Sequence, residues 1–421
     1  MKTTHLMIAL VLTAGAMNLS SCSDDDDNSN GGSNITESDY NDKTYGNKAI
    51  SSCEDVVTRL TAANGKIASS QLSTHQEDFL REALKNTVSQ VIVPTYTRLA
   101  DEVEQLECTL HGLKAADITQ NQVDNACTHF KAARKYWELS EAFLMGAASD
   151  FDVDPTIDSW PLNRTLLLSY FKNGMSEEAL EDATILGFHA LEFILFRNGQ
   201  SRKAEEFRSN DTYTNFTAIS GAQELAYAQT ICTLLKQRTY QLQVAWEGET
   251  EGNKSRMDIV RQAGLDYLTT NGLSYGDNLV LAGISGSKST FPTIKSAIAQ
   301  VLSDDEGSCV AIANEVGTAK IANPFSAGDI SYVESPYSFN SITDFCDNIR
   351  SIRNVWLGST DGSIAQYSFS SFFLSVGENS TDEAVKTAYT DAIDNIGNMP
   401  SPFVKYVSTI WNLAFEDDND F

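Results

Sequence analysis

The chain has 421 residues and carries 30 lysines and arginines against 57 aspartates and glutamates, which gives a formal net charge of −27. A polyanion repels the phosphate backbone of nucleic acids, and the basic residues form no cluster, so nucleic-acid binding is not expected. The diffuse negative charge would concentrate cations, although solubility alone also explains it.

The N-terminus has the pattern of a bacterial lipoprotein signal. Lys2 and His5 precede an apolar stretch over residues 6–16, which is followed by Leu19-Ser20-Ser21-Cys22. We therefore expect residues 1–21 to be removed as a signal peptide and Cys22 to be acylated, which tethers the protein to a membrane. No later segment offers an apolar run of about 18 residues, the length that a spanning helix requires.

Residues 22–45 are predicted to form a solvated leash. An acidic run, Asp24 to Asp27, follows the cysteine, and Asn, Ser and Gly dominate to about Ser33, a composition that cannot bury enough apolar surface to fold. The acidic run resembles the export tag that sends some lipoproteins of Gram-negative gut bacteria to the outer surface, and a plain spacer is the alternative. The expected location is the cell envelope, on the outer membrane, with a periplasmic or a surface-exposed face.

Six cysteines remain when Cys22 is set aside, and outside the cytoplasm an even set can be oxidised. The best predicted pair is Cys108 with Cys127, which flank one helix-helix turn, and the next is Cys309 with Cys346. No Cys-x-x-Cys occurs, so a zinc knuckle is not expected.

Apolar residues recur at helical spacing and alternating strand patterns are scarce, so the predicted class is all-α. About 390 mature residues suggest two antiparallel helical bundles packed side by side, an N-terminal one over 46–250 and a C-terminal one over 251–421. A glycine- and charge-rich segment over 248–253 marks the boundary. The predicted helices are 73–113 with a kink at Pro94, 119–147, 164–171, 176–197, 221–246, 255–269, 277–284, 292–302, 308–321, 342–357, 369–376, 381–396 and 403–412.

The most unusual stretch is Gly187-Phe188-His189-Ala190-Leu191-Glu192. Every residue over 185–196 is apolar, Gly or Ala except His189 and Glu192, so this part of the predicted helix should be buried on nearly all sides. The two polar residues are three apart and share a helix face, and a buried carboxylate requires a partner. Gly187 indicates a close approach to the backbone, because a mid-helix Gly costs about 1 kcal/mol relative to Ala. There are two interpretations of His189 and Glu192. They stabilise helix packing, hydrogen-bonded to each other or to a neighbouring helix, or they form a functional site.

Arg134, Glu138 and Glu141 fall at i, i+4 and i+7 of another predicted helix. This spacing is typical of a solvated salt-bridge ladder. If Glu141 turns inward instead, it offers a second carboxylate to His189 and Glu192.

A zinc peptidase of the zincin type requires His-Glu-x-x-His, and His189 has no second histidine within its helix. Any metal site would combine one or two imidazoles with carboxylates, which suits iron, manganese or calcium better than catalytic zinc. The acidic loop over 150–154 imitates the start of an EF-hand, but Pro155 replaces the turn glycine.

Three blocks of sequence resemble the imelysin family, also called imelysin-like or iron-regulated periplasmic proteins. They are Arg134-Lys135-Tyr136-Trp137 through Asp158-Ser159-Trp160-Pro161, Gly187-x-His189-x-x-Glu192, and Glu334-Ser335-Pro336-Tyr337-Ser338 through Leu357-Gly358. The resemblance implies two helical bundles with the His and Glu near their junction, a cell-envelope location, an association with iron uptake and an old assignment as a metallopeptidase. The binding residues that it implies are Gly187, His189, Glu192, Glu141, Asp158, Trp160, Ser338 and Asn348, with His189, Glu192 and Glu141 as metal ligands.

The leading hypothesis is a lipid-anchored protein that binds a metal ion or a metal-bearing small ligand through His189 and Glu192, in a pocket between the bundles. Iron is the favoured metal, ahead of zinc and calcium, and other proteins of iron uptake are expected partners. One alternative is a metallopeptidase in which Glu192 acts as ligand or base. A second is a surface module that recognises a host or partner protein.

Overall fold

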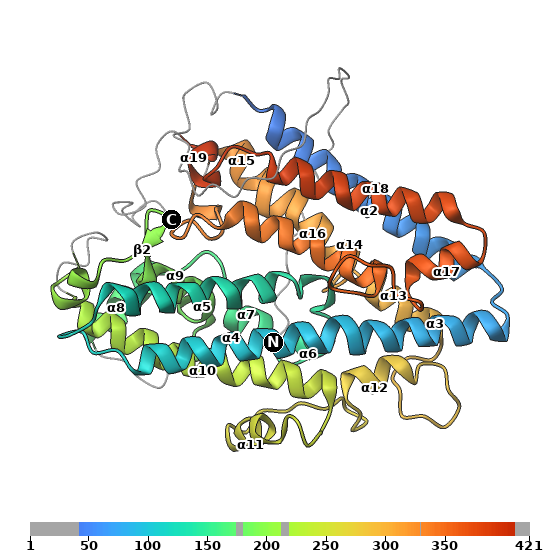
Figure 1. The fold of residues 1–421 in the computed structure, drawn as a ribbon, viewed down its shortest axis with the longest axis horizontal. Coiled ribbons are helices and arrows are strands. Elements are labelled where there is room, and N and C mark those ends of the chain that lie inside the picture. Colours follow the sequence, from blue (N-terminus) through green and yellow to red (C-terminus); the bar gives the residue numbers. More distant parts are fainter. Residues whose placement is uncertain (1–41, 174–179, 212–218, 329, 409–421) are drawn as a thin grey trace. The chain divides into compact units, whose positions relative to one another are not determined.

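Helices make up nearly all the regular structure of the protein (Figure 1), which is a computed structural model that describes residues 42–173, 180–211, 219–328 and 330–408. In these ranges the strands are β1 (Phe196–Arg197) and β2 (Gln200–Ser201), which pair as an antiparallel hairpin. The predicted all-α class is confirmed. The signal peptide, the lipidation site Cys22 and nearly all of the predicted leash lie outside the described residues.

The α-helices are α2 (Thr44–Ser69), α3 (Thr74–Thr87), α4 (Val93–His111), α5 (Gln120–Glu138), α6 (Ala147–Asp150), α7 (Val153–Ile157), α8 (Arg164–Asn173), α9 (Gly187–Leu195), α10 (Gly221–Glu247), α11 (Lys254–Gln262), α12 (Tyr275–Val280), α13 (Ile294–Ser303), α14 (Cys309–Glu315), α15 (Asn323–Ala327), α16 (Ser341–Leu357), α17 (Phe369–Ser375), α18 (Asn379–Gly397) and α19 (Phe403–Val407). The π-helical turns are η1 (Val88–Ile92) and η6 (Val316–Ala322), and the 3-10 turns are η2 (Glu141–Phe143), η4 (Ala183–Ile185), η5 (Ala204–Arg208) and η7 (Ile330–Tyr332).

The helical stretch predicted over 73–113 is present as α3, η1 and α4 in succession. It begins with a capping box between Ser73 and Gln76, and a second capping box, between Thr119 and Gln122, opens α5 as predicted. Pro94 lies in the first turn of α4, directly after the π-helical turn. Because proline has no N–H and its ring crowds the carbonyl four residues earlier, a widened turn at this point accommodates it.

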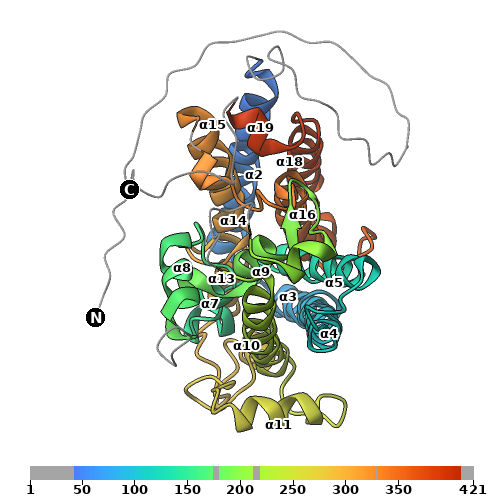
Figure 2. The same ribbon diagram turned by 90° about the vertical axis from the view of Figure 1, so that its left-hand side faces the viewer.

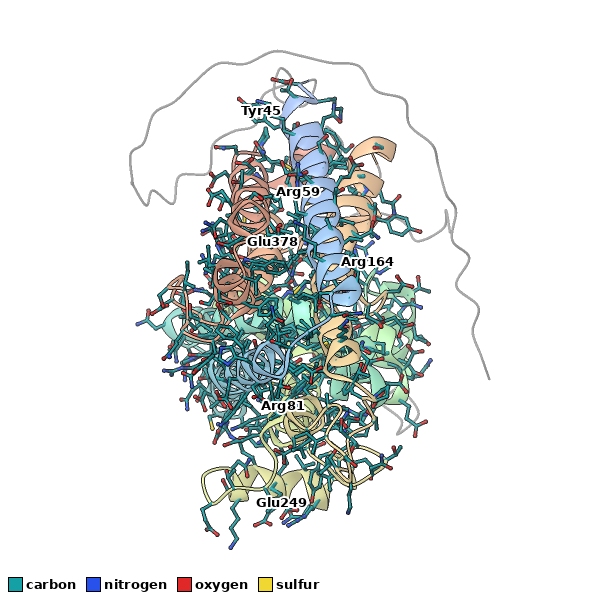
Figure 3. All side chains as sticks on the ribbon, turned by 90° about the vertical axis from the view of Figure 1, so that its right-hand side faces the viewer. Tyr45, Arg59, Arg81, Arg164, Glu249 and Glu378 are labelled. Atoms are coloured by element: carbon teal, nitrogen blue, oxygen red, sulfur yellow. The ribbon has the colours of Figure 1, made fainter. Side chains whose placement is uncertain are left out.

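Two sets of helices pack together, as Figures 1 and 2 show. In one set α4 packs against α5 and α10, and α9 packs on α10. In the other α2 packs against α18, α14 and η6, and α16 packs against α18. Figure 3 labels one residue of α2, Arg59, and the residue that precedes α18, Glu378, so that these two elements of the second set can be located.

Helix α16 joins the two sets, because it also contacts α5 and η2. The N-terminal α2 therefore packs with helices from beyond residue 251, so long-range packing crosses the predicted boundary, and the division of the chain at residue 250 stays a prediction. Within the described ranges, no helix has both the length and the apolar character that crossing a bilayer requires.

The helix predicted over 176–197 is shorter than expected. Its predicted first residue, Ser176, lies outside the described residues, and the helix that carries His189 and Glu192 starts only at Gly187. Before it, Asp182 caps the 3-10 turn η4 and Leu186 is extended. At the other end, Asn198 and Gly199, both with positive φ, turn the chain into the β1–β2 hairpin.

The predicted disulfides are wrong, because all six described cysteines are free. Cys108 is exposed, whereas Cys127 is buried and its Sγ donates to the carbonyl of Leu195 at 3.4 Å. Burial raises the pKa of the Cys127 thiol to about 12. The five buried thiols act as small apolar side chains rather than as cross-links.

Candidate functional site

Gly187 sets the position of the His189 and Glu192 side chains. Its φ is +71°, and a Cβ there would lie 2.1 Å from the carbonyl oxygen of Ile157. Only glycine therefore allows the start of α9 to touch the end of α7. The close approach predicted from Gly187 is real, although this glycine opens the helix instead of lying within it. Asp158, the residue after α7, is thereby brought to His189.

His189 is 1% exposed and lies among three carboxylates. Its Nε2 is 3.1 Å from Oδ1 of Asp158 and 3.9 Å from Oε1 of Glu334, and its Nδ1 is 3.8 Å from Oε2 of Glu192. The contact of Nε2 with Asp158 lacks hydrogen-bond geometry, so this nitrogen has no hydrogen-bond partner. The Trp160 ring covers the imidazole, with ring centroids 4.6 Å apart. Burial opposes protonation, but Asp158 outweighs it and the pKa of His189 is raised.

Glu192 is held by the loop before α16. Its Oε1 accepts hydrogen bonds from the backbone N–H of Tyr337 at 3.1 Å, the N–H of Ser338 at 2.7 Å and the Ser338 hydroxyl at 2.6 Å. Its Oε2 has no hydrogen-bond partner. One oxygen therefore ties α9 to the loop, and the other is buried beside His189.

Arg134 of α5 lies at the centre of the carboxylates and is 1% exposed. It forms ion pairs with Asp158, Glu138 and Glu334, the last at 2.6 Å. Its Nε is 3.5 Å from Asp344 of α16. Burial alone would lower the pKa of the guanidinium, but these carboxylates, led by Asp158, raise it well above its ordinary value.

A second buried cation comes from the π-helical turn η6. Lys320 is 8% exposed, and its Nζ lies 3.1 Å and 3.0 Å from the two oxygens of Glu334. Burial opposes the charge on Lys320, yet Glu334 and further carboxylates raise its pKa. Lys320 and Arg134 in turn hold the pKa of Glu334 below its ordinary value, against the effect of burial.

The remaining carboxylates differ in their partners and in the direction of their pKa shifts. Glu138 accepts a hydrogen bond from the Asn348 amide, whereas Glu141, 4% exposed, forms no hydrogen bond or ion pair with the described residues. Burial raises the pKa of both well above the ordinary range. Burial also raises the pKa of Asp344 to about 7. Asp158 behaves oppositely, because Arg134 and His189 overcome burial and lower its pKa.

We call this group the buried cluster, and its members are Arg134, Glu138, Glu141, Asp158, His189, Glu192, Lys320, Glu334 and Asp344. Six of these residues are carboxylates, and three are cations if His189 is protonated. Five of the carboxylate residues are at most 5% exposed, and the side chain of the sixth, Asp158, is 4% exposed. Such an excess of buried negative charge must be neutralised by protons or by a further cation.

Two triads within the cluster have the geometry of a metal site. Asp158, His189 and Glu334 each offer a ligand atom within 4.8 Å of the others, and so do Glu138, Glu141 and Asp158. Of the ligands predicted from the resemblance, His189 and Glu141 thus fall in different triads that share Asp158. Glu192 belongs to neither and lies beside the first.

The other predicted binding residues lie in or against the cluster. Trp160 covers His189, Ser338 holds Glu192, and Asn348 holds Glu138. The solvated ladder expected for Arg134, Glu138 and Glu141 is wrong, because all three side chains are buried; the inward-facing alternative for Glu141 is the observed one. Sequence reasoning missed Lys320 and Asp344. Glu334 stood in the matched third block, but nothing in the pattern around Lys320 distinguished it from a surface lysine.

Together, the fold and the cluster define an all-helical protein with a buried, carboxylate-rich ionic centre where α5, α9 and α16 meet. Residues 92–412 match the imelysin family, a peptidase family by description, and the chain belongs to that family.

Two relatives illustrate the family. Iron-regulated protein A of Synechococcus elongatus is 24% identical over 284 residues, which is 68% of this chain and 66% of that protein. A crystal structure described as an iron-regulated protein A precursor from Parabacteroides distasonis shares 24% identity and has a TM-score of 0.64, covering 82% of this chain and 91% of the other. The second similarity establishes a shared fold.

Proposed function

We propose that the protein binds a metal cation at the buried cluster, with His189, Asp158 and Glu334 as ligands. One observation carries the proposal: the Nε2 of a fully buried histidine has no hydrogen-bond partner and lies 3.1 Å and 3.9 Å from the oxygens of two carboxylates. A buried ring nitrogen without a well-aligned hydrogen bond is costly, and coordination of a cation between the imidazole and the carboxylates removes that cost.

The donor set fits a transition metal. Ligand atoms separated by these distances can converge on one ion after small shifts, since bonds to imidazole nitrogen and carboxylate oxygen are about 2.0–2.2 Å. The Asp158 and Glu334 oxygens concerned also contact Arg134. A bound cation would therefore share or replace those contacts, and the Glu141 and Glu192 carboxyl groups lie close by.

Iron is the metal that we favour, with manganese next. One imidazole among several carboxylates is a harder donor set than the nitrogen and sulfur ligands typical of zinc. The relative from Synechococcus is named for its regulation by iron, which agrees with a role in iron acquisition. We extend the proposal to an envelope protein tethered through Cys22, in line with the N-terminal signal.

Glu192 supports a binding role better than a peptidase role. The three hydrogen bonds to its Oε1 fix the carboxylate in place and occupy the oxygen that a catalytic base would need for water. We assign it as the residue that positions α9 and the negative charge beside His189.

The test is metal binding by the mature protein, measured by anaerobic equilibrium dialysis against Fe²⁺ and Mn²⁺ with elemental analysis. The double variant His189→Ala/Asp158→Asn should lose at least about tenfold in affinity. The matched control is His129→Ala/Glu102→Gln, which removes another histidine–carboxylate pair, 2.9 Å apart on α5 and α4. Equal affinity in all three proteins would contradict the proposal.

A further inference from the structure

The buried cluster contains a second group of ligand atoms that the proposed metal site does not use. Oxygens of Glu138, Glu141 and Asp158 lie within 4.8 Å of one another, and we call these residues the second triad. The first triad is the proposed site of Asp158, His189 and Glu334, so Asp158 belongs to both. The side chains of Glu138 and Asp158 are 0% and 4% exposed, and Glu141 is 4% exposed.

Glu141 is the member of the second triad that lacks a partner. Its carboxyl group forms no hydrogen bond or ion pair with the described residues, although it is directed towards Glu138 and Asp158. The buried ammonium group of Lys320 forms its ion pairs with Glu315 and Glu334 instead. Because a buried carboxylate without a donor or a counter-charge is costly, Glu141 requires a cation or a proton.

The backbone around Glu141 holds the side chain in this inward position. The 3-10 turn η2 begins at Glu141, shortly after the end of α5. The N–H of Ala142 donates to the Ser351 hydroxyl of α16 at 3.0 Å. The Phe143 carbonyl accepts from the Tyr96 hydroxyl of α4 at 3.3 Å. Since η2 is fixed to two helices, the ligand is placed in advance, which reduces the entropy lost on binding.

An unused amide oxygen lies beside the second triad. Asn348 of α16 is fully buried, and its Nδ2 donates to Oε2 of Glu138, whereas its Oδ1 has no hydrogen-bond partner. The two ends of an amide have nearly the same shape, so a half-turn of this group would place the oxygen where the nitrogen lies. The oxygen would then be a neutral ligand next to Glu138, and carbonyl and carboxylate oxygens together suit Mn²⁺.

The Asp158 carboxylate can serve both triads, because its two oxygens have different neighbours. Oδ1 lies 3.1 Å from Nε2 of His189, and Oδ2 accepts from the indole N–H of Trp137 at 2.6 Å. Each carboxylate oxygen has two lone pairs, so the bond from Trp137 leaves one lone pair of Oδ2 for an ion. Ions in two-metal sites lie about 3.5–4 Å apart, a separation that one bridging carboxylate spans.

The charge of the cluster matches two divalent ions better than one. A histidine that binds a metal is neutral, and the six carboxylates counted as ionised then exceed Arg134 and Lys320 by four charges. One divalent ion would offset half of this excess, and two would offset all of it. Protons are the alternative, and they would leave the second triad without a metal ion. Arg134 contacts Oε1 of Glu138 and Oδ1 of Asp158, so an ion would share these carboxylates with the guanidinium.

We propose that the buried cluster holds two divalent metal ions, the second bound by Glu138, Glu141 and Asp158 and joined to the first through the Asp158 carboxylate. Asn348 supplies a neutral oxygen to the second ion. This inference rests on the proposed function, because the first ion occupies the triad that contains His189. The second site has oxygen ligands alone, which favours Mn²⁺ or Fe²⁺ over zinc.

Mn²⁺ tests the proposal on the unmodified protein. Anaerobic equilibrium dialysis in about 0.15 M salt, which weakens binding at exposed acids, should give two Mn²⁺ ions per chain. The EPR spectrum of the loaded protein should be that of a magnetically coupled pair, because a carboxylate joins the two ions. One ion per chain at saturation, or two ions with the spectrum of isolated Mn²⁺, would overturn the proposal.

Single substitutions separate the two sites. Glu141→Gln keeps the size of the side chain and removes its charge, so this variant should bind one Mn²⁺ ion and give the spectrum of an isolated ion. His189→Ala should also bind one ion. The control Glu249→Gln makes the same change as Glu141→Gln at a side chain that is 49% exposed and is labelled in Figure 3, and it should bind two. Thermal unfolding establishes that each variant is folded before the titration.

The outcomes distinguish the second site from the first. If Glu141→Gln bound as many ions as wild type while His189→Ala lost one, the first site would stand and the second would be refuted. If Glu141→Gln lost an ion and His189→Ala lost none, the result would support the second triad and contradict the first. An equal loss in Glu249→Gln and Glu141→Gln would show a general charge effect and refute the second site.

Discussion

At the scale of single residues, Glu192 is the side chain whose role the structure changes most. The sequence suggested a ligand or a base, whereas three hydrogen bonds from Tyr337 and Ser338 make it the anchor between α9 and the loop before α16. Glu192→Gln keeps the shape but loses the charge that strengthens these bonds. We expect a loss of about 1–3 kcal/mol in the free energy of unfolding, measured by urea denaturation.

Ser338→Ala provides the comparison for that measurement. It removes only the hydroxyl bond, so a loss of about 1 kcal/mol is expected. If the two changes act on one contact, the double variant should lose less than the sum of the single losses. Strict additivity, or no effect of Glu192→Gln, would contradict the anchoring role.

Asp344 makes a prediction about pH. Burial raises its pKa in the folded protein to about 7 from its ordinary value of 3.8, so between these values the folded state holds a proton that the unfolded state has released. This group therefore stabilises less as pH rises from about 4 to 7, by up to about 1.4 kcal/mol per pH unit. Asp344→Asn cannot titrate, so its unfolding free energy relative to wild type should increase over that range. Parallel pH profiles of the two proteins would refute the assignment.

At the scale of secondary structure, the junction of α7 and α9 depends on Gly187. Ala at this position would have both an unfavourable φ and a Cβ 2.1 Å from a backbone oxygen. Gly264 has a similar φ, +68°, with nothing within 4 Å of its virtual Cβ, so Gly264→Ala measures the backbone cost alone. We expect that control to lose about 1 kcal/mol and Gly187→Ala to lose clearly more in thermal and urea unfolding. Equal losses would mean that the contact with Ile157 is unimportant.

The sequence predicted many of the helices because local signals specify them. The helices predicted to begin at residues 73, 119 and 308 start where the structure has capping boxes at Ser73 and Thr119 and an N-cap at Ser308. Helix α2 was not predicted, although its buried residues, among them Val56, Leu60 and Ile67, recur at helical spacing. The helix predicted over 176–197 was too long, because a continuous apolar run gives no sign of the break at Leu186 and Gly187. That break arises where Gly187 contacts the end of α7, which is distant in the sequence.

The buried cluster shows the same limit at the scale of the whole molecule. The Gly-x-His-x-x-Glu motif located its centre, and the family resemblance added Asp158, Trp160, Ser338 and Asn348. Arg134 was expected on a solvated face and Lys320 was not expected at all, because their burial results from packing among α5, η6 and α16 and from no local pattern. Sequence motifs predicted residues that share one helix or one short block of sequence, whereas the charge balance arises only where elements distant in the sequence pack together.

That balance gives the last prediction. Arg134 contacts at least three buried carboxylates, so Arg134→Met leaves them uncompensated and should cost about 3–5 kcal/mol at pH 7. The control is Arg59→Met on α2 (Figure 3), whose ion pair with Asp55 is 47% exposed on the arginine side and contributes at most about 1 kcal/mol.

Protons and metal ions should each offset the loss of Arg134. At pH 5 more of the carboxylates are protonated, so the destabilisation by Arg134→Met should shrink relative to pH 7. Saturating Mn²⁺ at pH 7 should stabilise Arg134→Met more than wild type, because the cation then meets carboxylates that no guanidinium contacts. Urea denaturation with and without Mn²⁺ measures both effects. Because Arg59→Met leaves the cluster intact, Mn²⁺ should stabilise it by the same amount as wild type. If Mn²⁺ also stabilised Arg134→Met by only that amount, the cation would bind elsewhere.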